Sequence, residues 1–231
     1  MAEATLPVAA NPLTRKAMRT PRAAGVAGVA FALLLTVSLV LVRVAVPYNP
    51  KDAGHWLDDG GKRDAVMLAL NLLPFAGIAF LWFIAVVRDR IGQGEDRFFA
   101  TVFLGSGLLF IAMLFVAGAT AGGLMLMARE SAALGVWSFG RRVSYTLLNV
   151  YAMRMAAVFT ISTTTIAARL GLAPRWLTAL GMVTGLALLV TAGSIPWVEL
   201  MFPAWVLVFS LHILVATFHQ PARDPELSEH A

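Results

Sequence analysis

The chain has 231 residues, of which 59% are hydrophobic and 13% are charged, and 18 Lys and Arg against 13 acidic residues give a formal net charge of +5. Such a composition leaves too little polar surface for a soluble globule, and because the basic residues flank long apolar runs, they indicate a membrane protein rather than a partner of nucleic acid. The absence of cysteine excludes disulfides and thiolate chemistry.

Long uncharged stretches predict the fold class. Residues 65–87 and 176–198 contain no Asp, Glu, Lys or Arg, and each exceeds the ~20 residues that a spanning helix needs. We therefore expect an all-α, polytopic transmembrane bundle of about six spanning helices in one membrane domain, residues 23–218. The expected helices are 23–46, 64–87, 98–123, 143–168, 176–192 and 196–218.

Residues 1–22 are rich in Arg, Lys and Pro and are expected to form a disordered basic arm on the cytoplasmic side. The apolar core that follows, 25–42, is longer than the ~7–15 residues of a signal-peptide core. The first run is therefore expected to be a retained anchor.

A near-neutral loop leads to the second run, in which Asn71 precedes Pro74 by three residues, and this spacing predicts a kink.

The third run is too long for a simple span. Its 31 uncharged residues, 98–128, would extend ~46 Å as a helix, against a hydrocarbon core of ~30 Å. The run must tilt, project or break, and the Gly-rich stretch 117–123 is the expected break. Two small-xxx-small pairs predict close helix packing: Gly118 with Gly122, and Gly181 with Gly185.

The fourth run contains Arg154, and a central Arg costs about 2.5–3.5 kcal/mol on insertion scales. Glu199, in the first turn of the sixth run, is the best candidate carboxylate partner. An Arg154–Glu199 lock or an interfacial helix is the preferred interpretation, and an Arg that lines an anion or headgroup pathway is the alternative. Helical spacing places Tyr151, Arg154, Ser162 and Thr165 on one face, which predicts either a polar stripe facing a cavity or interhelical hydrogen bonds.

In the sixth run, His212 could titrate near neutral pH, but without a nearby acid or second His it is expected to be a packed histidine rather than a metal ligand. The tail, 219–231, is polar and expected to be disordered.

An even number of spans places both termini on one side of the membrane. The presumed cytoplasmic side then carries ten basic residues against seven, a bias that favours cytoplasmic termini. The rival is a five-span protein in which the Arg154 segment lies in the interface or re-enters the membrane, which would place the C-terminus outside.

The stretch Ala173-Pro174-Arg175-Trp176-Leu177-Thr178-Ala179-Leu180-Gly181, followed by an apolar run and Phe202-Pro203-Ala204-Trp205, resembles the C-terminal pattern of several uncharacterised bacterial multi-pass membrane families. The resemblance covers about the last quarter of the chain and implies a bacterial cytoplasmic (inner) membrane setting. It implies no activity.

The functional classes follow from these residues. No catalytic motif, dinucleotide fingerprint or close pair of intramembrane carboxylates is present, so we expect no catalytic residue, cofactor or metal. An assembly, lipid-interacting or accessory role ranks first, with the lipid bilayer and further copies of the chain or other membrane proteins as partners. A small-solute or anion transporter that uses Arg154 ranks second, and a membrane-embedded enzyme third.

Overall fold

The computed structural model describes residues 20–46, 55–91, 97–127 and 134–218, and within these ranges the regular structure is helical, without strands. The helices are α1 (Thr20–Ala45), η2 (His55–Asp58), α2 (Gly60–Ile91), α3 (Arg97–Met127), α4 (Leu134–Thr146), a π-helical segment (Leu147–Ala152), α5 (Met153–Arg169), α6 (Arg175–Thr191), η6 (Val198–Leu200) and α7 (Met201–Phe218). Five helical stretches of the described residues are long and apolar enough to cross a membrane. They are α1, α2, α3, α7 with η6, and the continuous helix Gly135–Arg169 that α4, the π-helical segment and α5 form together; α6 is a shorter apolar helix. The all-α class and the multi-pass membrane architecture predicted from the sequence are confirmed.

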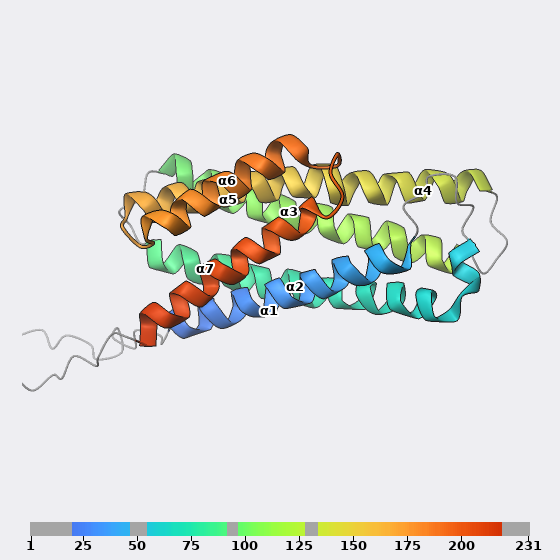
Figure 1. The fold of residues 1–231 in the computed structure, drawn as a ribbon, viewed down its shortest axis with the longest axis horizontal. Coiled ribbons are helices and arrows are strands. Elements are labelled where there is room, and N and C mark those ends of the chain that lie inside the picture. Colours follow the sequence, from blue (N-terminus) through green and yellow to red (C-terminus); the bar gives the residue numbers. More distant parts are fainter. Residues whose placement is uncertain (1–19, 47–54, 92–96, 128–133, 219–231) are drawn as a thin grey trace, which may run out of the picture.

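The helices run side by side in one elongated bundle (Figure 1). The start of α1 and the end of α7 lie at the same end, together with the turn between α5 and α6; we call this the proximal end and the opposite one the distal end. Helices α4 and α5 form one helix along the bundle, and α5 packs against both α3 and α6. The Arg154 segment is thus part of a helix long and apolar enough to cross a membrane, and its placement in the membrane stays a prediction.

The ends of the predicted elements differ from the structure in two places. Helix α1 begins at Thr20, so the last residues of the expected arm, 20–22, are helical; residues 1–19 and the expected tail, 219–231, lie outside the described residues. Helix α3 runs without interruption through the Gly-rich stretch where a break was expected. A glycine costs a helix only ~1 kcal/mol, and packing of α3 against α2 and α4 outweighs that cost.

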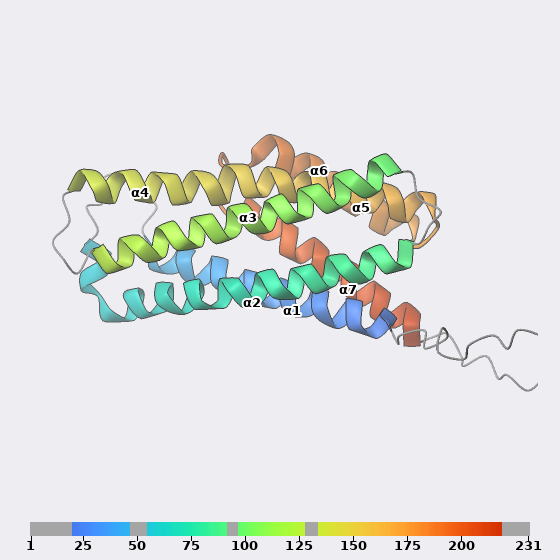
Figure 2. The ribbon, with the colours of Figure 1, turned by 180° about the vertical axis from the view of Figure 1, so that it is seen from behind.

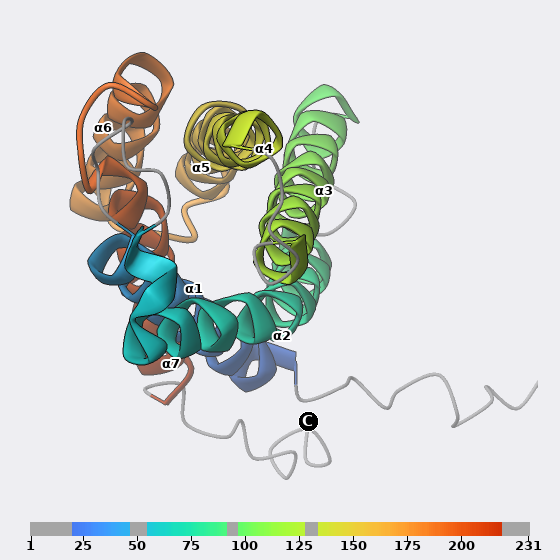
Figure 3. The ribbon, with the colours of Figure 1, turned by 90° about the vertical axis from the view of Figure 1, so that its right-hand side faces the viewer.

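The long third run projects beyond the α6–α7 turn instead of breaking. Helix α6 has 17 residues, or ~25 Å. Helix α3 has 31 residues, and the continuous α4–α5 helix has 35 residues, Gly135–Arg169. Figures 1 and 2 show that the α6–α7 turn lies partway along the bundle while α2, α3 and α4 continue. We call this continuation, made of η2, residues 60–70, residues 118–127 and α4, the distal extension. Figure 3 shows the bundle from one end, with α4 and α5 nearly in line.

Two separate clusters form the interior. The phenylalanine core fills the bundle with rings that are 0–1% exposed: Phe31, Phe80, Phe83, Phe103, Phe110, Phe159 and Phe202. Phe80 is central, because its ring centroid lies 4.4 Å from that of Phe31 and 5.0 Å from that of Phe159. The second cluster, the tryptophan core, lies in the distal extension and contains Ala45, Trp56, Val66, Leu124, Met125 and Trp137.

Candidate polar site at the distal mouth of the bundle

A buried ion pair joins the end of α1 to the start of α7. Arg43 Nε and Nη2 both donate to Glu199 Oε1, at 3.1 Å and 2.5 Å, and the side chains are 16% and 6% exposed. The Arg43 guanidinium also lies 5.8 Å from the centroid of the Trp197 ring. A pair with so little water around it holds α1 against the α6–α7 turn, because removing one partner would leave the other charge buried and uncompensated.

The turn between α6 and α7 delivers Glu199 into this position through unusual backbone geometry. Gly193 has φ +81° and Trp197 has φ +70°. The left-handed region suits glycine, but it costs a bulky residue about 1–2 kcal/mol. Trp197 immediately precedes the short η6 helix, in which Val198 and Glu199 are both buried. The strained residue therefore ends the turn and points the next two side chains inward.

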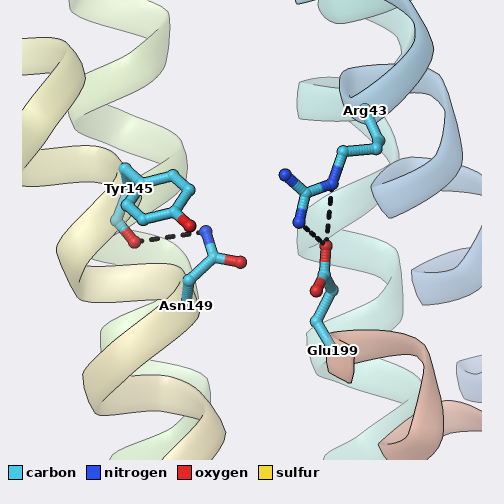
Figure 4. A network of polar contacts seen from close by, with 4 residues as sticks. All are labelled: Arg43, Tyr145, Asn149 and Glu199. Carbon is cyan, nitrogen blue, oxygen red and sulfur yellow. Dashed lines mark hydrogen bonds and ion pairs between the residues drawn. The ribbon is translucent and has the colours of Figure 1, made fainter. Parts of the chain in front are cut away.

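A π-helical segment forms the facing wall. Within Leu147–Ala152, the buried Asn149 donates from Nδ2 to the backbone oxygen of Tyr145 at 3.2 Å. Figure 4 shows the side chains of Tyr145 and Asn149 directed across the space toward Arg43 and Glu199. Gly193 packs against Val150, since a Cβ built on it would lie 2.9 Å from Val150 Cγ2. Single π turns within α-helices frequently occur at functional sites.

These residues form what we call the distal clasp: Arg43, Glu199, Trp197, Asn149 and Tyr145. It contains one compensated ion pair, an amide and a phenol, so its chemistry is hydrogen bonding and charge pairing. No three His, Asp or Glu side chains of the described ranges gather in a way that could hold a metal ion. The distal clasp lies where α6 ends and α7 begins, at the border of the distal extension.

Arg154 is not the partner of Glu199, so the expected Arg154–Glu199 lock is wrong. Arg154 is exposed on the outer face of α5, and it has no ion pair or hydrogen bond within the described part of the chain. It follows Val150 by four residues, or ~6 Å along the helix, and Val150 contacts the α6–α7 turn.

The expected polar face of α5 divides into two. Tyr151 is 55% exposed, on the outer side with Arg154, whereas Ser162 is 4% exposed and faces the interior. Thr165 is half-buried and donates its hydroxyl to the backbone oxygen of Ile161 at 2.8 Å. Tyr151 belongs to the π-helical segment and the other three residues to α5, and the four residues do not line a common cavity.

The other predicted site residues are dispersed. Asn71 is exposed on α2, and His212 is half-buried on α7. Gly181 lies against Thr164 and Trp205, and Gly185 against Ile161 and the backbone of Ala157. In α3, a Cβ on Gly118 would meet Leu73 at 3.1 Å, but one on Gly122 would meet nothing within 4 Å. Gly181 and Gly185 of α6 therefore pack closely against neighbouring helices, as their spacing predicts. In α3 only Gly118 does so, because Gly122 faces open space.

Sequence reasoning missed Arg43, Asn149, Tyr145 and Trp197 as site residues. A signal for Arg43 was available, because the first run ends on the same side of the membrane on which the sixth run begins, and Glu199 lies there. The π-helical segment and the left-handed Trp197 have no comparable signal, because both depend on tertiary packing.

The unbroken apolar helices, the ring-filled interior and the distal clasp define the class of the molecule: a polytopic α-helical membrane protein with an extension beyond one end of its bundle. No protein-family model, curated protein or solved structure matches the chain. The resemblance of its last quarter to bacterial membrane families stays a prediction from the residues.

Proposed function

We propose that this protein is an accessory component of its membrane, with a lipid-interacting or assembly role, rather than a solute transporter. The observation that carries the proposal is the phenylalanine core. A conduction path needs polar or hydrated walls along its length, but the rings of Phe31, Phe80 and Phe159 meet in the bundle interior at 0% exposure. The partners are the lipid bilayer and further copies of the chain or other membrane proteins.

The position of Arg154 supports the same role. A transporter that used Arg154 would direct it into a hydrated space between α5 and α7, whereas the side chain lies on the outer face of α5. There it can reach the phosphate layer and act as a contact to lipid. The contact also explains how a charge without a carboxylate partner among the described residues is accommodated in an apolar helix.

The proposed location is the bacterial cytoplasmic membrane, with the proximal end and both termini in the cytoplasm. Support comes from Arg88, Arg169 and Arg175, which belong to the proximal connections, as the positive-inside rule requires. The chain has no cysteine, so single cysteines report sidedness cleanly. In intact cells a membrane-impermeant maleimide should label Ser138→Cys in α4 and should label Leu172→Cys only after permeabilisation. The reverse pattern would overturn this orientation.

Reconstitution into liposomes tests the function. We expect efflux of chloride and of phosphate to equal that of protein-free liposomes, and we expect Arg154→Gln to change nothing. Removal of lipid from the purified protein should lower its thermal midpoint, and adding lipid back should restore it. Anion efflux that exceeds the protein-free rate and disappears in Arg154→Gln would reject the accessory role in favour of transport.

A further inference from the structure

A groove of about 340 Å³ lies between α5 and α6 at the proximal end of the bundle. Its described walls come from both helices: Thr164, Thr165, Ala168, Arg169, Arg175, Thr178, Ala179 and Met182. The turn from Leu170 to Pro174 reverses the chain, so that Arg169 ends α5 and Arg175 begins α6. Two guanidinium groups therefore flank one opening.

Among the described residues, no acidic side chain compensates the charge of this opening. No described residue of the groove wall is acidic, and neither Arg169 nor Arg175 has a carboxylate partner in the described ranges. The Arg169 guanidinium lies 4.4 Å from the centroid of the Phe99 ring, which orients the group without neutralising it. Two adjacent cations repel each other, and an anion placed between them removes that repulsion.

The hydroxyl groups of the groove wall are turned away from its opening. Thr164 lines the groove and is 2% exposed, and its Oγ1 has no hydrogen-bond partner in the described part of the chain. The neighbouring hydroxyls are already used, because Thr165 donates to Ile161 O at 2.8 Å and Thr178 donates to Arg175 O at 2.9 Å. The Thr164 Oγ1 atom faces Gly181 and Trp205, because a Cβ on Gly181 would collide with it, so recognition of an anionic ligand falls to the two guanidinium groups.

The rest of the groove is apolar. Ala168, Ala179 and Met182 supply a wall of two small side chains and one flexible side chain, a surface on which a hydrocarbon chain can lie. The groove is thus cationic at its opening and apolar along its wall. Free phosphate would gain nothing from the apolar part, whereas a phospholipid uses both parts.

We propose that this groove binds an anionic phospholipid, with the headgroup phosphate between Arg169 and Arg175 and an acyl chain along Ala168, Ala179 and Met182. Guanidinium groups suit the phosphate because each can donate two parallel hydrogen bonds to its oxygens. The inference rests on the proposed lipid-interacting role and names the lipid class and the residues that recognise it.

Native mass spectrometry and thermal unfolding of the purified full chain test the proposal. Phosphatidylglycerol should raise the thermal midpoint and stay bound, and phosphatidylcholine with the same acyl chains should do neither. Each of Arg169→Gln and Arg175→Gln should weaken phosphatidylglycerol binding about tenfold, as expected for loss of a charge-assisted contact. Thr164→Val should leave that binding unchanged, because the hydroxyl faces Gly181 and not the groove.

Matched controls separate this site from general charge effects. Arg142→Gln removes the same charge from an exposed position in α4 and should leave phosphatidylglycerol binding unchanged. Equal binding of the two lipids, or equal losses in Arg142→Gln and Arg175→Gln, would overturn the groove assignment. A midpoint shift by inorganic phosphate as large as that by phosphatidylglycerol would also overturn it. These outcomes leave the liposome experiment untouched, because Arg154-dependent efflux rejects the accessory role whatever the groove binds.

Discussion

The bundle and the distal extension are held together by different means. In the bundle, Phe80 is packed against five other phenylalanine rings. In the extension, one contact between Trp56 and Trp137, with centroids 6.2 Å apart, stands among a few aliphatic side chains. Lipid is as apolar as the helix surfaces, so helices in a membrane associate through close packing. The tryptophan core has one contact between two rings where the phenylalanine core has a network of them.

The largest effect is expected in the phenylalanine core. Phe80→Ala should lower the free energy of unfolding by about 3–5 kcal/mol, because the cavity lies among rings that surround it on all sides. Thermal unfolding in detergent measures the loss, and Phe75→Ala is the control, because Phe75 lies on the same helix and is 61% exposed. Equal losses for the two variants would mean that the bundle does not depend on ring packing.

The distal clasp, at the border between the two regions, comes next. Glu199→Ala should cost about 3 kcal/mol, because Arg43 would remain buried without its counter-charge. The double variant Arg43→Met with Glu199→Leu should recover most of that loss. The control is Lys62→Ala, which breaks an exposed pair with Asp59 at 3.7 Å and should cost less than about 1 kcal/mol. Failure of the double variant to recover stability would show that the pair does more than balance charge.

In the distal extension the same type of truncation should cost less. Trp137→Ala is expected to lower the free energy of unfolding by about 2 kcal/mol, since Trp137 is 9% exposed and belongs to a small cluster. Phe139→Ala, at a position that is 70% exposed, should stay within about 0.5 kcal/mol of the parent protein. A loss as large as that of Phe80→Ala would remove the distinction between the two regions.

The smallest effect compares two glycines that share one sequence pattern. Gly181→Ala should cost about 1–2 kcal/mol, because the added methyl group would collide with Thr164 and Trp205. Gly122→Ala has open space and should be neutral or stabilising by up to ~1 kcal/mol through helix propensity. Unfolding midpoints of the two variants give the comparison, and a loss in Gly122→Ala would indicate a packed surface there.

The helical membrane class was predicted well, because a charge-free stretch long enough to span a bilayer is rare outside membrane helices. The site was predicted poorly. Arg154 was predicted as a site residue because a charge in an apolar run is costly. Its depth in the membrane, however, depends on which part of the long α4–α5 helix lies in the membrane, and the sequence does not specify that part. Arg43 occupies an ordinary place at the end of a run, although it pairs with Glu199. Pairing between residues 156 positions apart depends on how the helices are arranged, which hydrophobic runs do not specify.

The π-helical segment between α4 and α5 has a consequence for how this molecule could change through evolution. A π turn holds one more residue than an α turn, and one residue corresponds to ~100° of rotation about the helix axis. The π-helical segment therefore sets the angle, about the helix axis, between the face of α5 that packs in the bundle and the face of α4 that packs on Trp56. Loss of one residue there would turn α4 by ~100° relative to α5 and so move its packing face away from Trp56, although the residues of both faces would be unchanged.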